Sequence, residues 1–360
     1  MDVTDSGHAE RVSAHAAVGA ELALLSDRRL GDAVSAAPSL GSGIGGRSAE
    51  MEVAGTRVFV KRVPLTDIEV QPGYVRSTAN VFDLPLFYQY GVGSAGFGAW
   101  RELAAHIMTT GWALNNDYAG FPLLYHWRVL PDSPPAGFVD GFGGVEGAVA
   151  HWEGSSAVRR RLGAIGRSSF SLVLFLEHVP QTLAAWLGDS RDAALPKPEG
   201  ESPCRWVENE LLRGTEFMSA RGLVHFDAHF ANLLTDGRRV YFADFGLALS
   251  RNFELSAQER VFLADHLVYD RSYAPSHLLR YHLPDDVRGG SEHGAFLRAW
   301  VDGHQPADVP PDIVAIIDRH APHALVLDDF HHRLLAQSKS TPFPAAEVRR
   351  ALTDASRSEP

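Results

Sequence analysis

Two short polar motifs in the second half of the chain constrain its fold and chemistry more than any other feature. His225, Asp227 and Asn232 form an H-x-D-x4-N pattern, and a D-F-G tripeptide begins at Asp244, twelve residues after the asparagine. In a chain of this composition, both motifs at this spacing arise by chance in about a few sequences per hundred thousand. An aspartate can accept or orient the proton of an attacking hydroxyl, and amide and carboxylate oxygens are ligands that Mg²⁺ prefers. We therefore predict that Asp227 is catalytic and that Asn232 and Asp244 bind Mg²⁺.

A glycine-rich motif lies nearer the N-terminus. Gly41, Gly43 and Gly46 form a G-x-G-x-x-G pattern, which is a weak signal by itself in a chain with 33 glycines. A dinucleotide-binding turn of the Rossmann type needs a strand immediately before the glycines and a helix after them. Here residues 36–39 read Ala-Ala-Pro-Ser and a β-branched run over residues 56–63 follows. This order favours a glycine-rich loop between antiparallel strands, where backbone N–H groups can approach phosphate oxygens.

Lys61 lies in the strand predicted over residues 56–63. Only three of the 33 basic residues are lysines, namely Lys61, Lys197 and Lys339, so arginine is the usual cation of this chain. A lysine is required where a compact ammonium fits and a planar guanidinium does not. We predict that Lys61 is held against phosphate oxygens; the alternative is an exposed lysine on a strand.

Together these motifs resemble those of the protein-kinase-like superfamily, and the match runs in order from Leu40 to about Ala248. The resemblance implies an α+β, bilobal fold with a β-rich N-lobe, a helical C-lobe, and ATP with Mg²⁺ in the cleft between them. In that family Asp227 corresponds to the catalytic aspartate, and Asn232 and Asp244 correspond to the metal ligands. Lys61 corresponds to the strand lysine that binds the α- and β-phosphates.

The same resemblance assigns the remaining nucleotide contacts. Gly41, Gly43 and Gly46 correspond to the glycine-rich loop over the phosphates. Residues 171–180 resemble the strand and hinge that meet adenine through the backbone of Glu177 and Val179. Glu102, in a segment with helical spacing over residues 97–114, is our choice for the glutamate that pairs with Lys61. A solvated helix glutamate is the alternative.

The domain organisation follows from the same reading. We expect a helical extension over residues 1–35 and an N-lobe over 36–180, with an insertion at about 64–97 and the hinge at 177–180. We expect a helical C-lobe over 181–360 that carries the catalytic and metal-binding loops. Residues 8–30 and 181–187 are each predicted to form a helix. Residues 122–130 and 169–176 are predicted to be strands, and 131–155 a loop. Three consecutive arginines at 159–161 are interpreted as a solvated face or loop.

Several positions depart from the protein-kinase pattern. Phe226 stands where an arginine usually meets an activation-loop phosphate, and His229 stands where protein kinases usually carry lysine. Histidine at that position is typical of enzymes similar to aminoglycoside and choline phosphotransferases. No A-P-E follows Asp244, and a capping-box pattern, Ser256 to Glu259, begins a helix about ten residues beyond the D-F-G. We therefore expect activity without a phosphate on Ser250, with Phe226 and Phe245 packed against the helical lobe.

Composition narrows the remaining possibilities. The net charge is −11, which gives no support to non-specific nucleic-acid or membrane binding. The single cysteine, Cys204, excludes an intramolecular disulfide, and we see no secretory signal in the polar first ten residues. We expect a cytoplasmic protein.

The expected function is ATP-dependent phosphoryl transfer to a Ser or Thr hydroxyl of a protein. A small-molecule kinase similar to the aminoglycoside or choline phosphotransferases is the first alternative. A nucleotide-binding pseudokinase without turnover is the second. The sequence does not name the acceptor.

Overall fold

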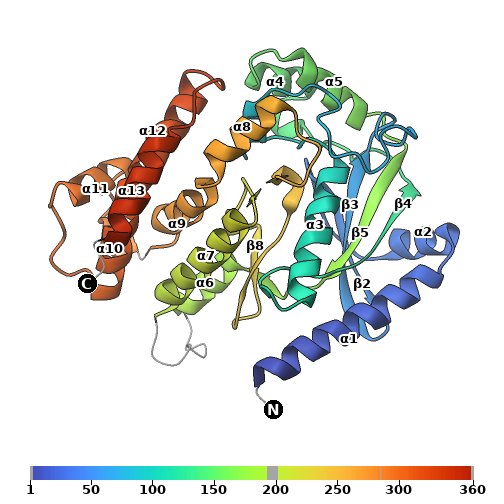
Figure 1. Ribbon diagram of the computed structural model, residues 1–360, viewed down its shortest axis with the longest axis horizontal. Coiled ribbons are helices and arrows are strands. Elements are labelled where there is room, and N and C mark those ends of the chain that lie inside the picture. The colour runs from blue at the N-terminus through green and yellow to red at the C-terminus, as the bar shows by residue number, and fades with distance from the viewer. Residues whose placement is uncertain (1–2, 193–201, 284, 358–360) are drawn as a thin grey trace. The chain divides into compact units, whose positions relative to one another are not determined.

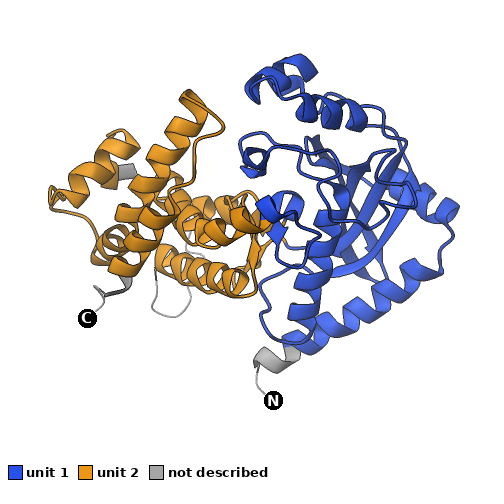
Figure 2. Cartoon of the chain, turned by 45° about the horizontal axis from the view of Figure 1, so that its top comes forward, with its two compact units in different colours: residues 1–179, 244–259 blue, residues 180–243, 260–360 orange. Residues whose placement is uncertain are grey.

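The computed structural model of the chain is an α+β structure and describes residues 3–192, 202–283 and 285–357 (Figure 1). It divides into two units, coloured blue and orange in Figure 2. The first contains residues 1–179 and 244–259, and the second contains residues 180–243 and 260–360. The chain thus returns to the first unit at Asp244, the first residue of the D-F-G motif. Lys197 lies outside the described residues.

The first unit contains a five-stranded antiparallel sheet with strand order β1-β2-β3-β5-β4. Its strands are β1 (Ser39–Gly43), β2 (Gly46–Val53), β3 (Thr56–Leu65), β4 (Leu124–Pro131) and β5 (Phe170–Glu177). The first three form consecutive hairpins, and the predicted strands at 56–63, 122–130 and 169–176 are all confirmed within two residues. The glycine motif lies in the β1–β2 hairpin, between antiparallel strands as predicted.

Helices cover both faces of this sheet. Helices α1 (Val3–Leu24) and α2 (Asp27–Ala36) cover one face and share an apolar cluster with β3. Val18 and Leu22 of α1, Leu30 and Val34 of α2, and Val58 and Val60 of β3 belong to this cluster. Helix α3 (Ala99–Leu114) covers the other face, with Val63 and Leu65. Because side chains alternate along a strand, Lys61 lies on the same face as Val63 and Leu65, the face that α3 covers. This parity brings the lysine to the helix that carries Glu102.

The single helix predicted over residues 8–30 is wrong. Two helices form instead, because the hydroxyl of Ser26 accepts a hydrogen bond from the backbone N–H of Arg29 and caps α2.

A third apolar cluster of the first unit contains residues from the predicted insertion and from the segment that follows β4. Residues 66–98 contain only a short 3₁₀ turn, Leu86–Gln89, and they pack against α4 (Val145–His151) and α5 (Ser156–Ile165). Residues 131–155, predicted to be a loop, therefore include a 3₁₀ turn at Asp140–Phe142 and a helix. The cluster buries apolar side chains from every part of this region: Phe82, Leu84, Tyr88, Phe97, Trp152, Val158 and Leu162.

Arg161 in this region corrects the interpretation of the arginine run. Its side chain is only 2% exposed, and it forms a buried ion pair with Glu69 at 2.9 Å. Glu69 also accepts a hydrogen bond from the N–H of Ala99 at 2.9 Å, so it caps the beginning of α3. The N-cap residue is Gly98, which has no side chain that could cap the helix. A residue of the insertion, Glu69, therefore caps α3 in place of the N-cap residue.

The second unit is mainly helical. Its helices are α6 (Leu183–Asp192), α7 (Pro203–Ala220), α8 (Ala257–His266), which begins in the first unit, α9 (Tyr269–Tyr281), α10 (Asp285–Arg288), α11 (His293–Val301), α12 (Pro311–Ala336) and α13 (Ala345–Arg357). Helix α12 packs against α7, α9, α11 and α13. The helix predicted from residue 181 begins two residues later, because Gln181–Thr182 form strand β6.

Short strands complete the architecture. Strand β6 pairs with β8 (Leu233–Thr235), which pairs with β9 (Val240–Phe242). Strand β7 (Leu223–Val224) precedes the H-x-D-x4-N loop, and β10 (Leu249–Ser250) follows the D-F-G. No described helix is long and apolar enough to cross a membrane.

The glycine hairpin provides a test of the fold. Gly46 has φ of +122°, and a Cβ at this position would come within 2.2 Å of the carbonyl oxygen of Arg62, whereas a Cβ at Gly43 would meet nothing within 4 Å. We predict that Gly46→Ala lowers the free energy of unfolding by at least about 2 kcal/mol, while Gly43→Ala changes it by less than about 1 kcal/mol. Urea unfolding curves of both variants measure the difference. Equal midpoints would contradict the hairpin geometry.

Candidate functional site

One group of candidate residues is centred on Lys61 in the first unit. Its Nζ donates to Oε1 of Glu102 at 2.6 Å and to Oδ1 of Asp244 at 2.7 Å. The lysine and Glu102 are 8% and 2% exposed, respectively. These residues come from β3, α3 and the D-F-G segment, and the two bonds span 41 and 183 residues of the chain. The structure therefore pairs Lys61 with Glu102, as the sequence predicted.

Burial and charge act in opposite directions on this lysine. Burial by itself favours the neutral amine, but the carboxylates of Asp244 and Glu102 overcome that effect, and the pKa of Lys61 is raised. Burial raises the pKa of Glu102 to about 7, against the attraction of Lys61 and with a further contribution from the negative charge of Asp244. Two carboxylates therefore share one buried ammonium.

The D-F-G segment has an unusual backbone. Asp244 adopts φ of +60°, in the left-handed region, and its carboxylate accepts a hydrogen bond from the N–H of Gly246 at 3.3 Å. The ring of Phe245 is buried and packs edge-on against His106 of α3, with Phe121 beside it. The prediction had placed Phe245 against the helical lobe, whereas these neighbours lie in the first unit. This packing fixes the segment to the helix that carries Glu102.

The glycine hairpin reaches the same lysine. Gly43 pairs with Gly46, and the turn between them is Ile44-Gly45. A Cβ on Gly45 would lie 3.8 Å from Nζ of Lys61. Gly41 and Gly43 lie on the exposed strand β1. Of the glycines in this hairpin, Gly45 is therefore the one beside Lys61, and it is a residue that the sequence pattern did not single out.

Glu177, at the end of β5, is held by its neighbours. Its backbone N–H donates to the carbonyl of Leu123 at 2.8 Å, so only its carbonyl remains available for a backbone role toward a base. Its carboxylate accepts two hydrogen bonds from Arg11 of α1, at 2.9 and 2.6 Å. The N-terminal helix therefore fixes the strand end expected to meet adenine. Val179 is the last residue of the first unit before the chain enters the second.

A second group of candidate residues lies in the loop between β7 and β8 of the second unit. Nδ2 of Asn232 donates to Oδ2 of Asp227 at 3.0 Å and to the carbonyl of Asp227 at 3.1 Å. Because the amide nitrogen is used in this way, Oδ1 is the atom of Asn232 suited to a metal. His229 lies beside Asp227, with Nε2 3.8 Å from Oδ1.

Asp270 of α9 holds this loop through two backbone hydrogen bonds. Its buried carboxylate accepts hydrogen bonds from the N–H groups of His225, at 2.6 Å, and Phe226, at 3.0 Å. His225 in turn accepts from the N–H of Asp227 at Nδ1 and contacts the carbonyl of Ala243 at Nε2, so its proton is on Nε2. Burial raises the pKa of Asp270 to about 7, although the two backbone donors act to lower it. Asp270 has no sequence motif that would have revealed it.

Phe226 packs as predicted. It has φ of +65°, and its ring contacts Phe262, His266 and Tyr269 of the second unit. Phe226, the residue that stands in place of the usual arginine, therefore belongs to a cluster of aromatic rings.

The predicted capping box also forms. The N–H of Ser256 donates to Glu259 at 2.9 Å, and the N–H of Glu259 donates to Ser256 at 3.1 Å. The sequence gave Glu259 only this role. It did not reveal that the other oxygen of Glu259 bonds to Arg101, the residue next to Glu102.

Comparisons with known proteins add no assignment: no protein-family model matches the chain, and neither does any curated protein. Within the described residues, no group of three or more His, Cys, Asp or Glu side chains is arranged to hold a metal ion.

The aromatic cluster around Phe226 predicts a pH dependence. Burial lowers the pKa of His266 to about 4, with Arg349 adding to the effect against the hydrogen bond to the carbonyl of Phe262. Between this value and the ordinary 6.5, the unfolded chain binds a proton that the folded chain does not, so stability is full above pH 6.5 and is lost as the pH falls. For this group the loss is about 2 kcal/mol between pH 7 and pH 5.

We predict that His266→Phe reduces the acid destabilisation by about this amount, measured by urea unfolding at both pH values. His304→Phe, at an exposed position, is the control and keeps the dependence of the parent. Parallel curves for His266→Phe and the parent would contradict a buried neutral histidine.

Proposed function

We propose that the protein is an ATP-dependent phosphotransferase of the protein-kinase-like type, which transfers the γ-phosphate to a hydroxyl. In this proposal the two units are the N-lobe and C-lobe of a bilobal kinase fold. The observation that carries the proposal is the position of Lys61, buried between Glu102 and Asp244. A strand lysine, a helix glutamate and a D-F-G aspartate, chosen from sequence motifs far apart in the chain, meet at one ammonium.

Each part of the site has a role in this reaction. Lys61 provides a compact positive charge for the phosphate oxygens, and Glu102 holds it in place. The hairpin turn at Gly45 lies next to that charge without a side chain to exclude a phosphate. Glu177 and Val179 supply backbone groups for adenine.

The donor set suits Mg²⁺. Asp244 offers a carboxylate and Asn232 an amide oxygen, which is left for a metal because its nitrogen donates to Asp227. Mg²⁺ held by these two residues would neutralise charge on the phosphate oxygens.

Asp227 is the catalytic residue of the proposal. Its carboxylate accepts or orients the proton of the attacking hydroxyl, and Asn232 holds it through Oδ2. Asp270 and His225 keep the loop in shape through backbone N–H groups and the carbonyl of Ala243. These contacts cost no reorganisation during the reaction, because they exist before the substrate binds.

The acceptor is either a Ser or Thr hydroxyl of a protein, as the sequence predicted, or a small molecule. One observation favours the small molecule: the segment after the D-F-G is short and is tied to residues 66–98, as Glu254 donates from its N–H to Thr78 at 2.8 Å. A segment bound in this way offers little backbone for docking a peptide. Labelled ATP incubated with protein and metabolite pools separates the two acceptors, and a nucleotide-binding pseudokinase would label neither.

Lys61→Arg tests the role of the ammonium. We predict a loss of at least about 100-fold in kcat/KM with an intact fold, because a guanidinium cannot occupy the space between two carboxylates that already lie within bonding distance. Lys339→Arg is the matched control, since Lys339 is similarly buried, at 6% exposed, and its ammonium donates to the carbonyl of Leu334, outside the proposed site residues. Steady-state kinetics and circular dichroism give the two measurements. Full activity in Lys61→Arg would return Lys61 to a structural role.

Asp227→Asn and Asp244→Asn separate the catalytic residue from the metal ligand. We predict that Asp227→Asn lowers kcat by at least about 100-fold and changes the Kd for Mg²⁺-ATP by less than about threefold. Asp244→Asn should instead raise the Mg²⁺ concentration needed for both binding and turnover, because it removes the charge of a ligand. Calorimetric titration and Mg²⁺-dependent kinetics measure both effects. Superimposable Mg²⁺ titrations of Asp244→Asn and the parent would exclude Asp244 as a ligand.

A further inference from the structure

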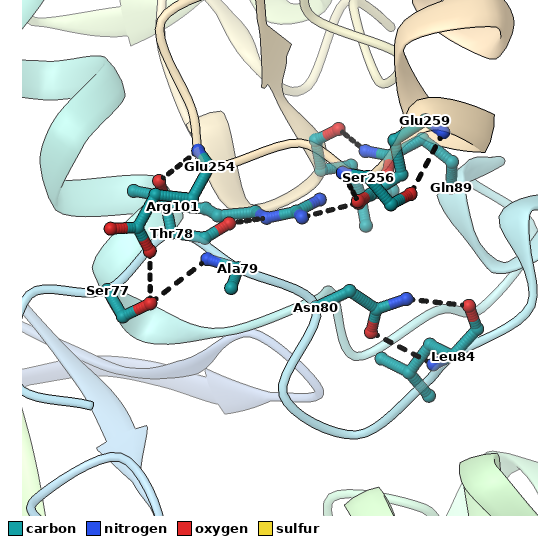
Figure 3. Close-up of polar contacts among 11 residues, drawn as sticks. Ser77, Thr78, Ala79, Asn80, Leu84, Gln89, Arg101, Glu254, Ser256 and Glu259 are labelled. Atoms are coloured by element: carbon teal, nitrogen blue, oxygen red, sulfur yellow. Dashed lines mark hydrogen bonds and ion pairs between the residues drawn. The ribbon is translucent and has the colours of Figure 1, made fainter. Parts of the chain in front are cut away.

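The segment that follows the D-F-G is bound by residues of the insertion (Figure 3). The side-chain amide of Gln89 donates to the carbonyl of Leu247. Thr78 accepts from the N–H of Glu254 at 2.8 Å, and the hydroxyl of Ser77 donates to the carboxylate of Glu254. Both ends of residues 247–254 are therefore tied to residues 66–98, which include most of the insertion predicted at about 64–97.

The insertion is itself rigid at this point. The side chain of Asn80 spans a turn, donating to the carbonyl of Leu84 at 2.8 Å and accepting from its N–H at 2.9 Å. Leu84 belongs to the apolar cluster with Tyr88 and Trp152. The contacts to Gln89 and Thr78 therefore come from a packed surface.

Arg101 joins this surface to the end of the segment. Its Nε donates to the carbonyl of Thr78 at 2.7 Å, and Nη2 donates to Oε1 of Glu259 at 2.5 Å. The two side chains are 2% and 3% exposed, and the guanidinium lies over the rings of Phe97 and Phe253. A buried guanidinium needs such partners, because an unpaired one is costly.

Arg101 is also next to Glu102. The same turn of α3 therefore holds Lys61 through one residue and the segment 244–259 through the other. A shift of the segment that separates Glu259 from Arg101 would move α3, and a rotation of α3 would move the carboxylate that Lys61 binds.

The acidic groups in this arrangement belong to the chain itself and are not added by phosphorylation. Glu254 and Glu259 supply carboxylates within the segment, and the hydroxyl of Ser250 is 1% exposed and accepts from the N–H of Asn252 at 3.2 Å. In kinases that are switched on by phosphorylation, an added phosphate supplies the charge that orders this part of the chain. Here the carboxylates, the insertion and Arg101 are present from the start.

We propose that Arg101 is a positioning residue that, with Glu259 and the insertion around Thr78, keeps the D-F-G segment and Glu102 in their active arrangement without phosphorylation. The proposal rests on the proposed phosphotransferase function, and it concerns the arrangement of groups in the first unit alone. Arg101 acts through Glu102 and the segment, and it is not expected to touch the substrate.

Three variants test the proposal. Glu259→Gln removes the charge that binds Arg101 but keeps an acceptor for the N–H of Ser256, since glutamine also forms capping boxes. Arg101→Met combined with Glu259→Gln removes both charges, so no buried charge is left without its partner if the single change fails to fold. Ser256→Ala is the matched control, because it removes the acceptor for the N–H of Glu259 and leaves the ion pair.

Arg319→Met provides a second control in the other unit. It removes an ion pair to the buried Glu208 at 2.6 Å that includes no residue of the proposed machinery, and so measures the effect of lost stability.

Two measurements are made on each full-length variant: hydrogen exchange of the amides of residues 244–255 without ligand, and kcat with KM for ATP. We expect Glu259→Gln and the double variant to raise exchange in 244–255 by at least about tenfold, with exchange in β3 and β5 unchanged. We expect kcat to fall by at least about tenfold in both, while the two controls stay within about twofold of the parent. Phosphatase treatment of the parent should leave its rate unchanged.

The proposal is overturned if exchange in 244–255 and kcat both stay within about twofold of the parent. It is equally overturned if exchange rises throughout the first unit while kcat per folded molecule is unchanged, because that result describes a merely structural ion pair. A phosphate on Ser250 whose removal abolishes activity also overturns it. If the parent itself does not turn over ATP, the proposed function fails, and the exchange data still decide whether Arg101 and Glu259 hold the segment.

Discussion

The first unit depends on one buried ammonium. Lys61 cannot stay charged on the covered face of a sheet unless carboxylates meet it, and both Glu102 and Asp244 do so within 2.7 Å. An ion pair of this kind stabilises little by itself, because desolvation offsets much of the attraction. It does bring three segments together, because strand β3, helix α3 and the D-F-G segment each supply one of the charged groups.

The insertion supplies much of the support for that arrangement. Glu69 caps α3 and pairs with Arg161 of α5, while Thr78 accepts hydrogen bonds from Arg101 and from the segment after the D-F-G. These polar contacts are anchored by an apolar cluster of their own. A region without regular secondary structure thereby determines the position of a helix and of a loop.

In the second unit, the loop that carries Asp227 is held mainly by hydrogen bonds and aromatic packing. The loop of Asp227 is held by backbone hydrogen bonds to Asp270 and by the aromatic packing of Phe226. Aromatic packing does not respond to a phosphate, whereas an arginine in place of Phe226 would. Within each unit, the proposed catalytic groups are therefore held by contacts that do not depend on an added phosphate.

The sequence by itself determined the α+β class, the strand that carries Lys61, the helix that carries Glu102 and the capping box at Ser256, because each depends on local periodicity or on a motif of fixed spacing. It could not determine the roles of Arg101, Arg161 or Asp270. Burial of an arginine or an aspartate depends on partners such as Glu259, Glu69 and the N–H of His225, which are 158, 92 and 45 residues away in the chain. Only the tertiary structure brings those partners together, and no local pattern of residues records that they meet.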